Sequence, residues 1–123
     1  MINKIAKITV FVESQEEAKK FWTEKMGFIV TEEKPAGPDM TWLELSPQGS
    51  DSPAIIFFPK NLMMQRYPQI VAHPSIMFSA ENIEELWEQL NENGVEISEI
   101  QENSFGKIFD FLDNEGNPYM VRG

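Results

Sequence analysis

Residues 5–28 read IAKITVFVESQEEAKKFWTEKMGF, and residues 74–97 repeat the same order of features as PSIMFSAENIEELWEQLNENGVEI. Each copy runs from an alternating strand through a polar helix start and an amphipathic helix to a glycine and a new strand. Ser14 stands three residues before Glu17, and Asn82 stands three residues before Glu85. This is the spacing of a capping box at the start of a helix. The repeat predicts a chain built from two similar βα units.

Strand patterns after each helix complete the repeat. Apolar and β-branched runs that are bounded by Gly, Pro, Asn or Ser predict strands. Their ranges are 4–13, 28–33, 40–45 and 53–58 in the first half, and 75–80, 95–100, 105–112 and 118–122 in the second. The predicted order is βαβββ followed by βαβββ, an α+β fold in one domain. We expect module one over residues 1–60, a linker over 61–72 and module two over 73–123.

The linker is rich in large apolar side chains, namely Leu62, Met63, Met64 and Tyr67. We therefore expect it to pack against the fold or to line a ligand entrance.

Composition excludes several classes of function. The net charge is −10, with 20 acidic residues against 10 basic ones, and such a surface repels nucleic-acid phosphates and anionic membranes. There are no cysteines, which excludes disulfides, thiol nucleophiles and cysteine metal sites. No apolar run approaches the roughly 20 residues of a membrane span, and no signal-peptide pattern opens the sequence. We expect a cytoplasmic protein that binds neither nucleic acid nor membrane.

Two stretches carry a resemblance to a known family: ITVFVESQEEAKKFWTEKMGF at residues 8–28 and FDFLDNEGNPYMV at residues 109–121. The chain resembles the vicinal oxygen chelate superfamily of glyoxalase I, bleomycin-resistance proteins, fosfomycin-resistance enzymes and extradiol dioxygenases. The second stretch is similar to the family's strand–DPDGN–strand ending, with Asn114 in place of the usual proline. The resemblance covers essentially the whole chain. It implies that each βαβββ module curls into half of a cup-shaped mixed sheet that holds the ligand.

The metal enzymes of that superfamily carry His or Glu on the inner face of four strands. The resemblance transfers these positions to Lys7, Phe57, Ser75 and Met120. An ammonium and a phenyl ring cannot ligate a hard metal, and a hydroxyl and a thioether suit it poorly. We therefore expect no cofactor. A displaced divalent-metal site at His73, Glu44 and Asp110 is the alternative that remains open.

Strand alternation predicts an inner face that is apolar and rich in aromatic groups, with a few polar side chains, which is the composition of a small-molecule pocket. The candidate ligand-binding residues are Lys7, Thr9, Trp42, Glu44, Phe57, Ser75, Met77, Asp110 and Met120. Trp42 and Phe57 would stack on a planar or cationic ligand. Glu44 and Asp110 would pair with a ligand cation, and Lys7 would neutralise one of them or bind a ligand anion. We interpret Phe11, Ile55 and Ile108, on the same face, as packing.

The sequence thus predicts a metal-free relative of the bleomycin-resistance proteins that binds a small amphipathic or cationic molecule and forms a homodimer. One alternative is a metal-dependent lyase, isomerase or dioxygenase of the same superfamily with a displaced site. Another is a structural or regulatory dimerisation module whose cup is filled by its own side chains. Bound metal would favour the first alternative, and a closed, filled core would favour the second.

Overall fold

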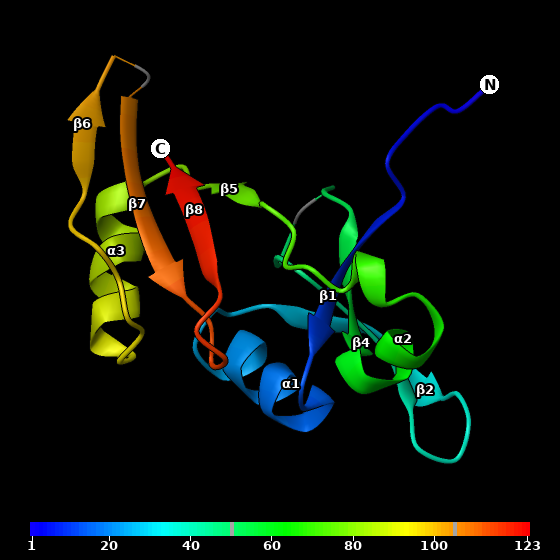
Figure 1. Cartoon of the computed structure of the whole chain (residues 1–123). Helices are drawn as coiled ribbons and strands as arrows, with labels where there is room; N and C mark the ends of the chain where they lie inside the picture. Colours follow the sequence, from blue (N-terminus) through cyan, green and yellow to red (C-terminus); the bar gives the residue numbers. More distant parts are fainter. Residues whose placement is uncertain (50, 105) are drawn as a thin grey trace. The chain divides into compact units, whose positions relative to one another are not determined.

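The computed structural model describes residues 1–49, 51–104 and 106–123 (Figure 1). The chain divides into two compact units, Met1–Pro74 and Ser75–Gly123. Each unit contains a four-stranded mixed sheet, in the order β1-β4-β3-β2 in the first and β5-β8-β7-β6 in the second. In both sheets the first strand pairs in parallel with the last. This shared topology confirms the predicted repeat and the α+β class.

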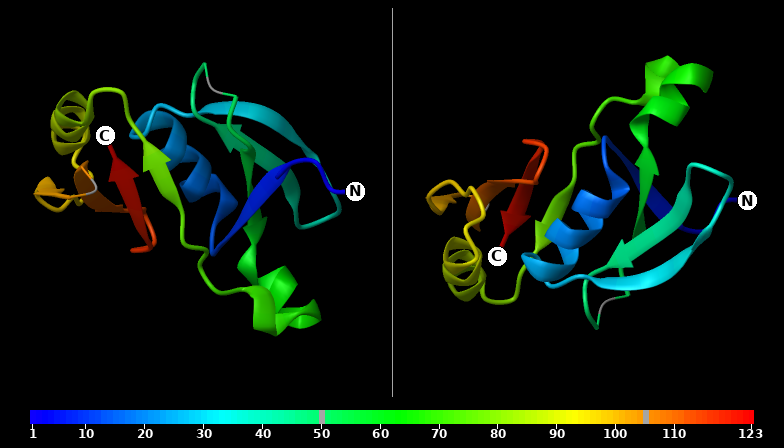
Figure 2. Two further views of the ribbon diagram at one scale, coloured as in Figure 1. Left: turned by 90° about the horizontal axis from the view of Figure 1, so that it is seen from above. Right: turned by 90° about the horizontal axis from the view of Figure 1, so that it is seen from below.

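The first unit begins with β1 (Lys7–Val12), α1 (Gln15–Glu24), β2 (Ile29–Pro35), β3 (Thr41–Ser46) and β4 (Ala54–Pro59). Helix α1 lies along one face of this sheet (Figure 2). Trp22 is fully buried beneath it, and its ring centroid lies 4.9 Å from that of Phe28 and 5.6 Å from that of Phe57. Aromatic side chains of this size bury a large apolar area, so this cluster anchors the helix on the sheet.

Both ends of α1 follow from its sequence. The Ser14 side chain accepts a hydrogen bond of 3.1 Å from the Glu17 backbone N–H, which satisfies one of the unpaired N–H groups of the first turn. Gly27 follows the helix with φ +74°, a conformation that glycine adopts without steric cost. The Gln15 amide donates to the carbonyls of Thr41 and Phe57 at 2.6 and 2.7 Å. The helix start is thereby fixed to β3 and β4.

The second unit contains β5 (Met77–Ser79), α3 (Ile83–Glu92), β6 (Gln101–Asn103), β7 (Gly106–Leu112) and β8 (Pro118–Arg122). Asn82 caps α3 as predicted, because its side chain accepts from the Glu85 N–H at 3.1 Å. The buried side chains of this unit come from α3, the segment that follows it, β7, the turn and β8, and they include Ile83, Leu90, Val95, Phe109, Phe111, Tyr119 and Val121.

The turn before β8 is organised by a buried carboxylate. Asp113 accepts hydrogen bonds from the backbone N–H groups of Glu115 and Asn117 and from the Tyr119 hydroxyl at 2.8 Å. Burial, together with the nearby Asp113 charge, raises the pKa of Tyr119 far above its ordinary value. The phenol therefore stays protonated and donates. Gly116, with φ +82°, completes the turn in a conformation that glycine adopts without steric cost.

One predicted strand differs from the structure. The strand predicted at 95–100 is wrong, because β6 lies at Gln101–Asn103 and residues 95–100 contribute a single bridge, between Ile97 and Phe111. The Asp110 N–H donates to the Ser98 hydroxyl rather than to a strand carbonyl, which interrupts the ladder. The half-buried Trp87 of α3 donates to the Ser98 carbonyl at 2.8 Å, which ties this segment to the helix. Phe105, the predicted start of a strand, lies outside the described residues.

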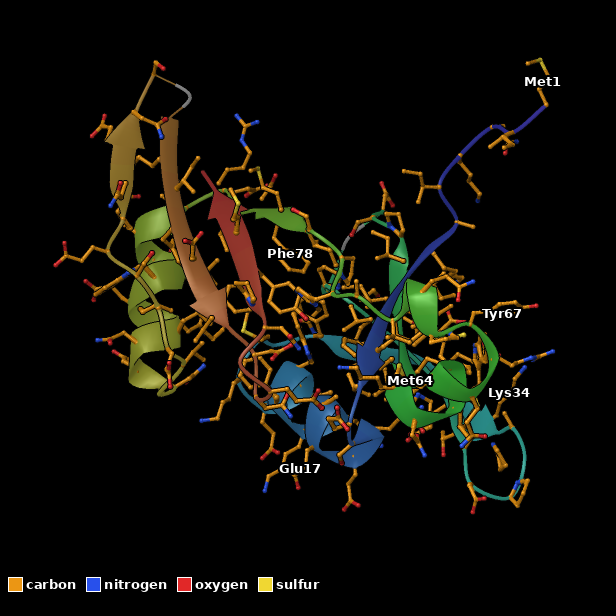
Figure 3. All side chains as sticks on the ribbon, viewed as in Figure 1. Met1, Glu17, Lys34, Met64, Tyr67 and Phe78 are labelled. Carbon is orange, nitrogen blue, oxygen red and sulfur yellow. The ribbon has the colours of Figure 1, made fainter. Side chains whose placement is uncertain are left out.

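The predicted linker carries helical structure that the sequence analysis did not identify. Helix α2 covers Lys60–Arg66, and the 3₁₀ turn η1 covers Pro68–Ile70. Leu62 and Met63 are half-buried, whereas Met64 and Tyr67 are exposed (Figure 3). No helix in the described part of the chain is long and apolar enough to cross a membrane.

Candidate functional site

Strand register decides which side chains share the sheet face that lies opposite α1. Lys7, Thr9 and Phe11 of β1 lie opposite Ala54, Ile56 and Phe58 of β4, and Glu44 of β3 lies opposite Ile56. Residues in register point to the same face of a sheet. We call this the site face; it carries Lys7, Thr9, Phe11, Trp42, Glu44, Ile56 and Phe58.

Phe57 does not belong to the site face, and its predicted position there is wrong. It lies opposite Val10, is fully buried and contacts the Trp22 ring beneath α1. Ile55 is buried on the same α1 side. The strand reads AIIFF, with apolar residues at every position. Alternation therefore gave no signal for its faces, and only pairing with β1 and β3 distinguishes them.

Glu44 is the central polar group of the site face. It is 4% exposed, and both of its carboxylate oxygens are occupied. Lys7 Nζ donates to Oε1 at 2.6 Å, and Trp42 Nε1 donates to Oε2 at 2.7 Å. The predicted cluster of Lys7, Trp42 and Glu44 is thus brought together, with Thr9 half-buried on the same face. Their binding of a ligand stays a prediction.

The charge state of Glu44 follows from these contacts. Burial disfavours the ionised form, but the hydrogen bonds from Lys7 and Trp42, the positive charge of Lys7 and a contact with the Glu32 side chain outweigh it. The pKa of Glu44 therefore lies below its ordinary value of about 4.5. The carboxylate is therefore ionised at neutral pH. The site face holds a buried negative charge that a hydrogen-bonded cation neutralises.

A hollow of about 470 Å³ opens where β1 and β4 begin and β3 ends. Its charged lining residues are Lys4, Lys7, Glu32, Glu44 and Asp51. Three carboxylates therefore face two ammonium groups. Glu32 lies directly opposite Glu44 in the sheet and pairs with Lys34 at 2.9 Å. The hollow is polar and, by this count of its lining groups, carries net negative charge.

Aromatic side chains gather at the other end of the site face. The ring centroids of Phe11 and Phe58 lie 6.2 Å apart in an edge-to-face arrangement. Extending the β3–β4 register by two residues places Trp42 opposite Phe58. All three side chains are half-buried. The site face is thus amphipathic along its strands, with carboxylates at one end and aromatic groups at the other.

The second sheet brings together three of the predicted residues. Met77 lies opposite Met120, and Met120 lies opposite Asp110, so these side chains share one face. Met77 is 49% exposed and Asp110 is also exposed. Ser75 is exposed and precedes β5 rather than lying within it. The sequence therefore identified the row correctly, and its role in ligand binding stays a prediction.

The residues at the transferred metal positions do not fit a metal. At the first position the Lys7 ammonium donates a hydrogen bond to Glu44, and a cation that acts as a donor has no lone pair for a metal. The position transferred to Phe57 lies in the core beneath α1 rather than on the site face. The β4 residues that do lie on the site face, Ile56 and Phe58, carry hydrocarbon side chains that cannot ligate a metal either. Within the described part of either unit, no three His, Asp or Glu side chains gather as a metal site requires.

Sequence reasoning missed several residues of this site. Thr31, Glu32 and Asp51 line the hollow, and Ile56 and Phe58 lie on the site face. Thr31 sits at a register shift in the β2–β3 pair, between Val30 and Glu32. A bulge of this kind re-aims side chains and cannot be read from alternation. Glu32 lies within the strand predicted at residues 28–33, but only its pairing with Glu44 brings it to the site.

Comparisons with known proteins agree with this architecture. The family model described as Glyoxalase/Bleomycin resistance protein/Dioxygenase superfamily matches residues 4–121. The uncharacterized protein YetH of Bacillus subtilis (strain 168) is 38% identical over 123 residues, which are 99% of each chain.

Solved structures show the same fold. TnmS3, an antibiotic binding protein from Streptomyces sp. CB03234, superposes with a TM-score of 0.81 at 23% identity, over 98% of this chain and 95% of its own. A member of the same superfamily from Sphaerobacter thermophilus DSM 20745 gives a TM-score of 0.82 at 21% identity, over 98% and 97% of the two chains. Together with the match of the family model, these observations establish that the chain belongs to the Glyoxalase/Bleomycin resistance protein/Dioxygenase superfamily.

Proposed function

We propose that the protein binds a small amphipathic molecule with a positively charged group on the site face, and that it does so without a metal and without chemistry on the ligand. The observation that carries this proposal is the ionised Glu44, buried to 4% exposure beside a group of half-buried aromatic rings. A buried carboxylate binds a cation more strongly than an exposed one, because water screens the attraction less.

The aromatic end suits the apolar body of such a ligand. The indole of Trp42 is held by its hydrogen bond to Glu44, so its orientation is set before a ligand arrives. Preorganised aromatic groups lose little conformational entropy on binding. They attract both planar rings and cations through the ring face.

Strand geometry sets the spacing that a ligand should match. Glu44 and Trp42 are two residues apart on β3, and a strand advances about 6.8 Å over two residues. A ligand whose charged nitrogen lies roughly 7 Å from the centre of its apolar body would contact both ends of the site face. The negative net charge of the chain, −10, would also attract a cation at long range.

One of the structural neighbours supports the binding proposal. TnmS3, which shares the fold, is described as an antibiotic binding protein. The Lys7 ammonium at one transferred metal position and the apolar Ile56 and Phe58 on β4 argue against the metal-dependent lyase, isomerase or dioxygenase alternative. The half-exposed Lys7 and the hollow beside Glu44 argue against a face that is filled entirely by its own side chains.

A homodimer forms part of the same proposal. Met64, Tyr67 and Ile70, on α2 and η1, are 46%, 51% and 48% exposed, and Figure 3 shows the Met64 and Tyr67 side chains on this segment. Exposed apolar clusters of this kind are typical of protein–protein contacts. Sedimentation equilibrium would measure the mass in solution, and a monomer across micromolar concentrations would contradict the dimer.

Isothermal titration calorimetry with 4-phenylbutylamine tests the binding proposal. The neutral 4-phenylbutanol serves as the matched ligand without charge. The protein should bind the amine more tightly than the alcohol, and Glu44→Gln should abolish that preference. Glu33→Gln is the matched control, because Glu33 is an exposed β2 glutamate that pairs with Lys19 on α1. Absence of amine binding, or binding that Glu44→Gln leaves unchanged, would overturn the proposal.

A further inference from the structure

We infer that Lys7 is a built-in competitor for this site: its ammonium occupies the cation position at Glu44, and the preferred ligands are amines whose N–H group takes its place. The inference rests on the proposed function and adds to it the class of ligand and the residue that sets its affinity.

The two hydrogen bonds of Glu44 differ in how firmly they are held. Trp42 Nε1 and Glu44 Oε2 belong to neighbouring positions of one central strand, β3, and are 2.7 Å apart. The Glu44 side chain is 5% exposed, so it cannot leave for solvent. Oε2 is therefore committed to Trp42, and Oε1 is the oxygen available for exchange.

The Lys7 ammonium can leave Glu44 for solvent. Its side chain is 45% exposed although its Nζ lies 2.6 Å from Oε1. It is the first residue of β1, which is an edge strand, and the residues before it are exposed. A lysine side chain has a flexible stem and a strongly hydrated ammonium. It can therefore return to water at small cost, whereas Glu44 cannot.

Exchange of one ammonium for another keeps the buried carboxylate neutralised in both states. An ion pair that loses one member leaves an uncompensated buried charge, which is strongly unfavourable. Lys7 supplies the missing cation when no ligand is present, and the ligand supplies it when bound. The protein can thus keep an ionised Glu44 on the site face without a ligand, at the expense of affinity for that ligand.

The same geometry predicts discrimination among cations. The bond that the ligand replaces is a short N–H···O hydrogen bond, so the ligand nitrogen must carry a proton. Protonated primary, secondary and tertiary amines fulfil this condition, whereas a quaternary ammonium has no N–H and its methyl groups hold the charge farther from Oε1. The trimethylammonium analogue of 4-phenylbutylamine should bind roughly tenfold more weakly than the amine, which is the worth of one charge-assisted hydrogen bond.

Lys7→Met removes the competing cation and keeps a flexible side chain of similar length. We expect this variant to bind 4-phenylbutylamine about three- to tenfold more tightly than the natural protein in calorimetry, since a partly exposed ion pair no longer has to be broken. Lys19→Met is the matched control, because it removes the same charge from α1, where Lys19 pairs with Glu33. It should change the affinity less than twofold, an effect of net charge alone.

Lys7→Arg provides a second test of the competitor role if Lys7→Met fails to fold. A guanidinium forms a stronger, forked contact with a carboxylate, so this variant should bind the amine more weakly than the natural protein. A ¹⁵N lysine-ammonium spectrum of the natural protein supplies an independent readout. The Lys7 signal, assigned by its loss in Lys7→Arg, should move toward the position of solvent-exposed lysines as the amine is added.

The outcomes separate this inference from the proposed function. Tighter binding by Lys7→Met supports both. Binding by the natural protein that depends on Glu44 but is unchanged or weakened in Lys7→Met would refute the competitor role and leave the binding function standing. A ligand-independent Lys7 signal would refute it as well. Failure of both the natural protein and Lys7→Met to bind the amine would overturn the proposed function itself.

Discussion

Replacing Glu44 by Gln should destabilise the protein by an amount that depends on pH. The substitution keeps the shape of the side chain and one carbonyl oxygen, which can still accept from Trp42 Nε1. It removes the charge and turns the other acceptor into a donor, so the 2.6 Å hydrogen bond from Lys7 is lost. The largest part of the effect is therefore the contact between Lys7 and Glu44, with a smaller part from the weaker, neutral hydrogen bond to Trp42.

The expected loss of stability follows from how exposed the side chains of Lys7 and Glu44 are. Pairs between fully exposed charges contribute about 0.2–1 kcal/mol, and hydrogen bonds to charged groups contribute about 1.5–3 kcal/mol. One partner here is 5% exposed and the other 45%, so a loss of about 1.5 kcal/mol at pH 7 is expected. For a chain of 123 residues this corresponds to a decrease in Tm of about 6 °C.

The dependence on pH has a definite sign. The pKa of Glu44 is lower in the folded protein than its ordinary value of about 4.5, so its ionised form stabilises the fold. That contribution is fully present above pH 4.5 and is lost as the pH falls through the folded-state pKa. Glu44→Gln does not titrate. The difference in stability between the two proteins should be largest at neutral pH and shrink as the pH falls below about 4.5.

Thermal and urea unfolding followed by circular dichroism, at pH 7 and at several values below 4.5, would measure this difference. Glu33→Gln is the control, because its pair with Lys19 is about 40% exposed on both sides and should contribute less than about 1 kcal/mol. Equal stabilities of the natural protein and Glu44→Gln at pH 7, or a difference that does not decrease in acid, would show that the carboxylate is not held as described.

Three further predictions concern the core, a helix cap and metal. Phe57→Ala should lower the free energy of unfolding in urea by about 3–5 kcal/mol, because Phe57 is fully buried beneath α1. Phe58→Ala should lower it less and should instead weaken amine binding. The reverse order of the two losses would show that the assigned faces of β4 are wrong. Asn82→Ala should cost about 1 kcal/mol through loss of the α3 cap, while Asn82→Asp should not; equal losses would contradict the cap. Addition of Zn²⁺, Ni²⁺, Mn²⁺ or Fe²⁺ at about 10 μM should leave Tm unchanged, and a rise that disappears in His73→Ala would favour the metal-dependent alternative.

Local chemistry made much of the fold predictable. Ser14 and Asn82 were identified as helix caps from the residue types and their three-residue spacing, which are sufficient because capping involves only neighbouring groups. The strand at residues 118–122 was predicted with the bounds that β8 has. The pairing of Trp42 with Glu44 on one face followed from the two-residue period of a strand.

Local chemistry failed where the outcome depended on distant partners. Residues 95–100 have the alternation of a strand, yet the Ser98 hydroxyl takes the Asp110 N–H and regular pairing begins only at Gln101. Helix α2 has apolar side chains at Leu62, Met63 and Met64, but its seven residues are too few to show a helical period, and none of them is buried. Both departures arise from contacts that sequence periodicity does not encode.

The candidate site divides in the same way. The sequence by itself placed Lys7 on one strand and Trp42 and Glu44 at alternate positions of another, and it contains no cysteine and a single histidine. It also predicted side chains that suit a metal poorly at the positions transferred from the family's metal enzymes, and the structure moves one of these, Phe57, off the site face. Tertiary structure alone decided that β4 turns Ile56 and Phe58, not Phe57, toward these residues. It also decided that Lys7 and Trp42 divide the two oxygens of Glu44. The physical reason is that strand periodicity fixes relative faces within one strand, whereas only pairing between strands fixes which faces coincide.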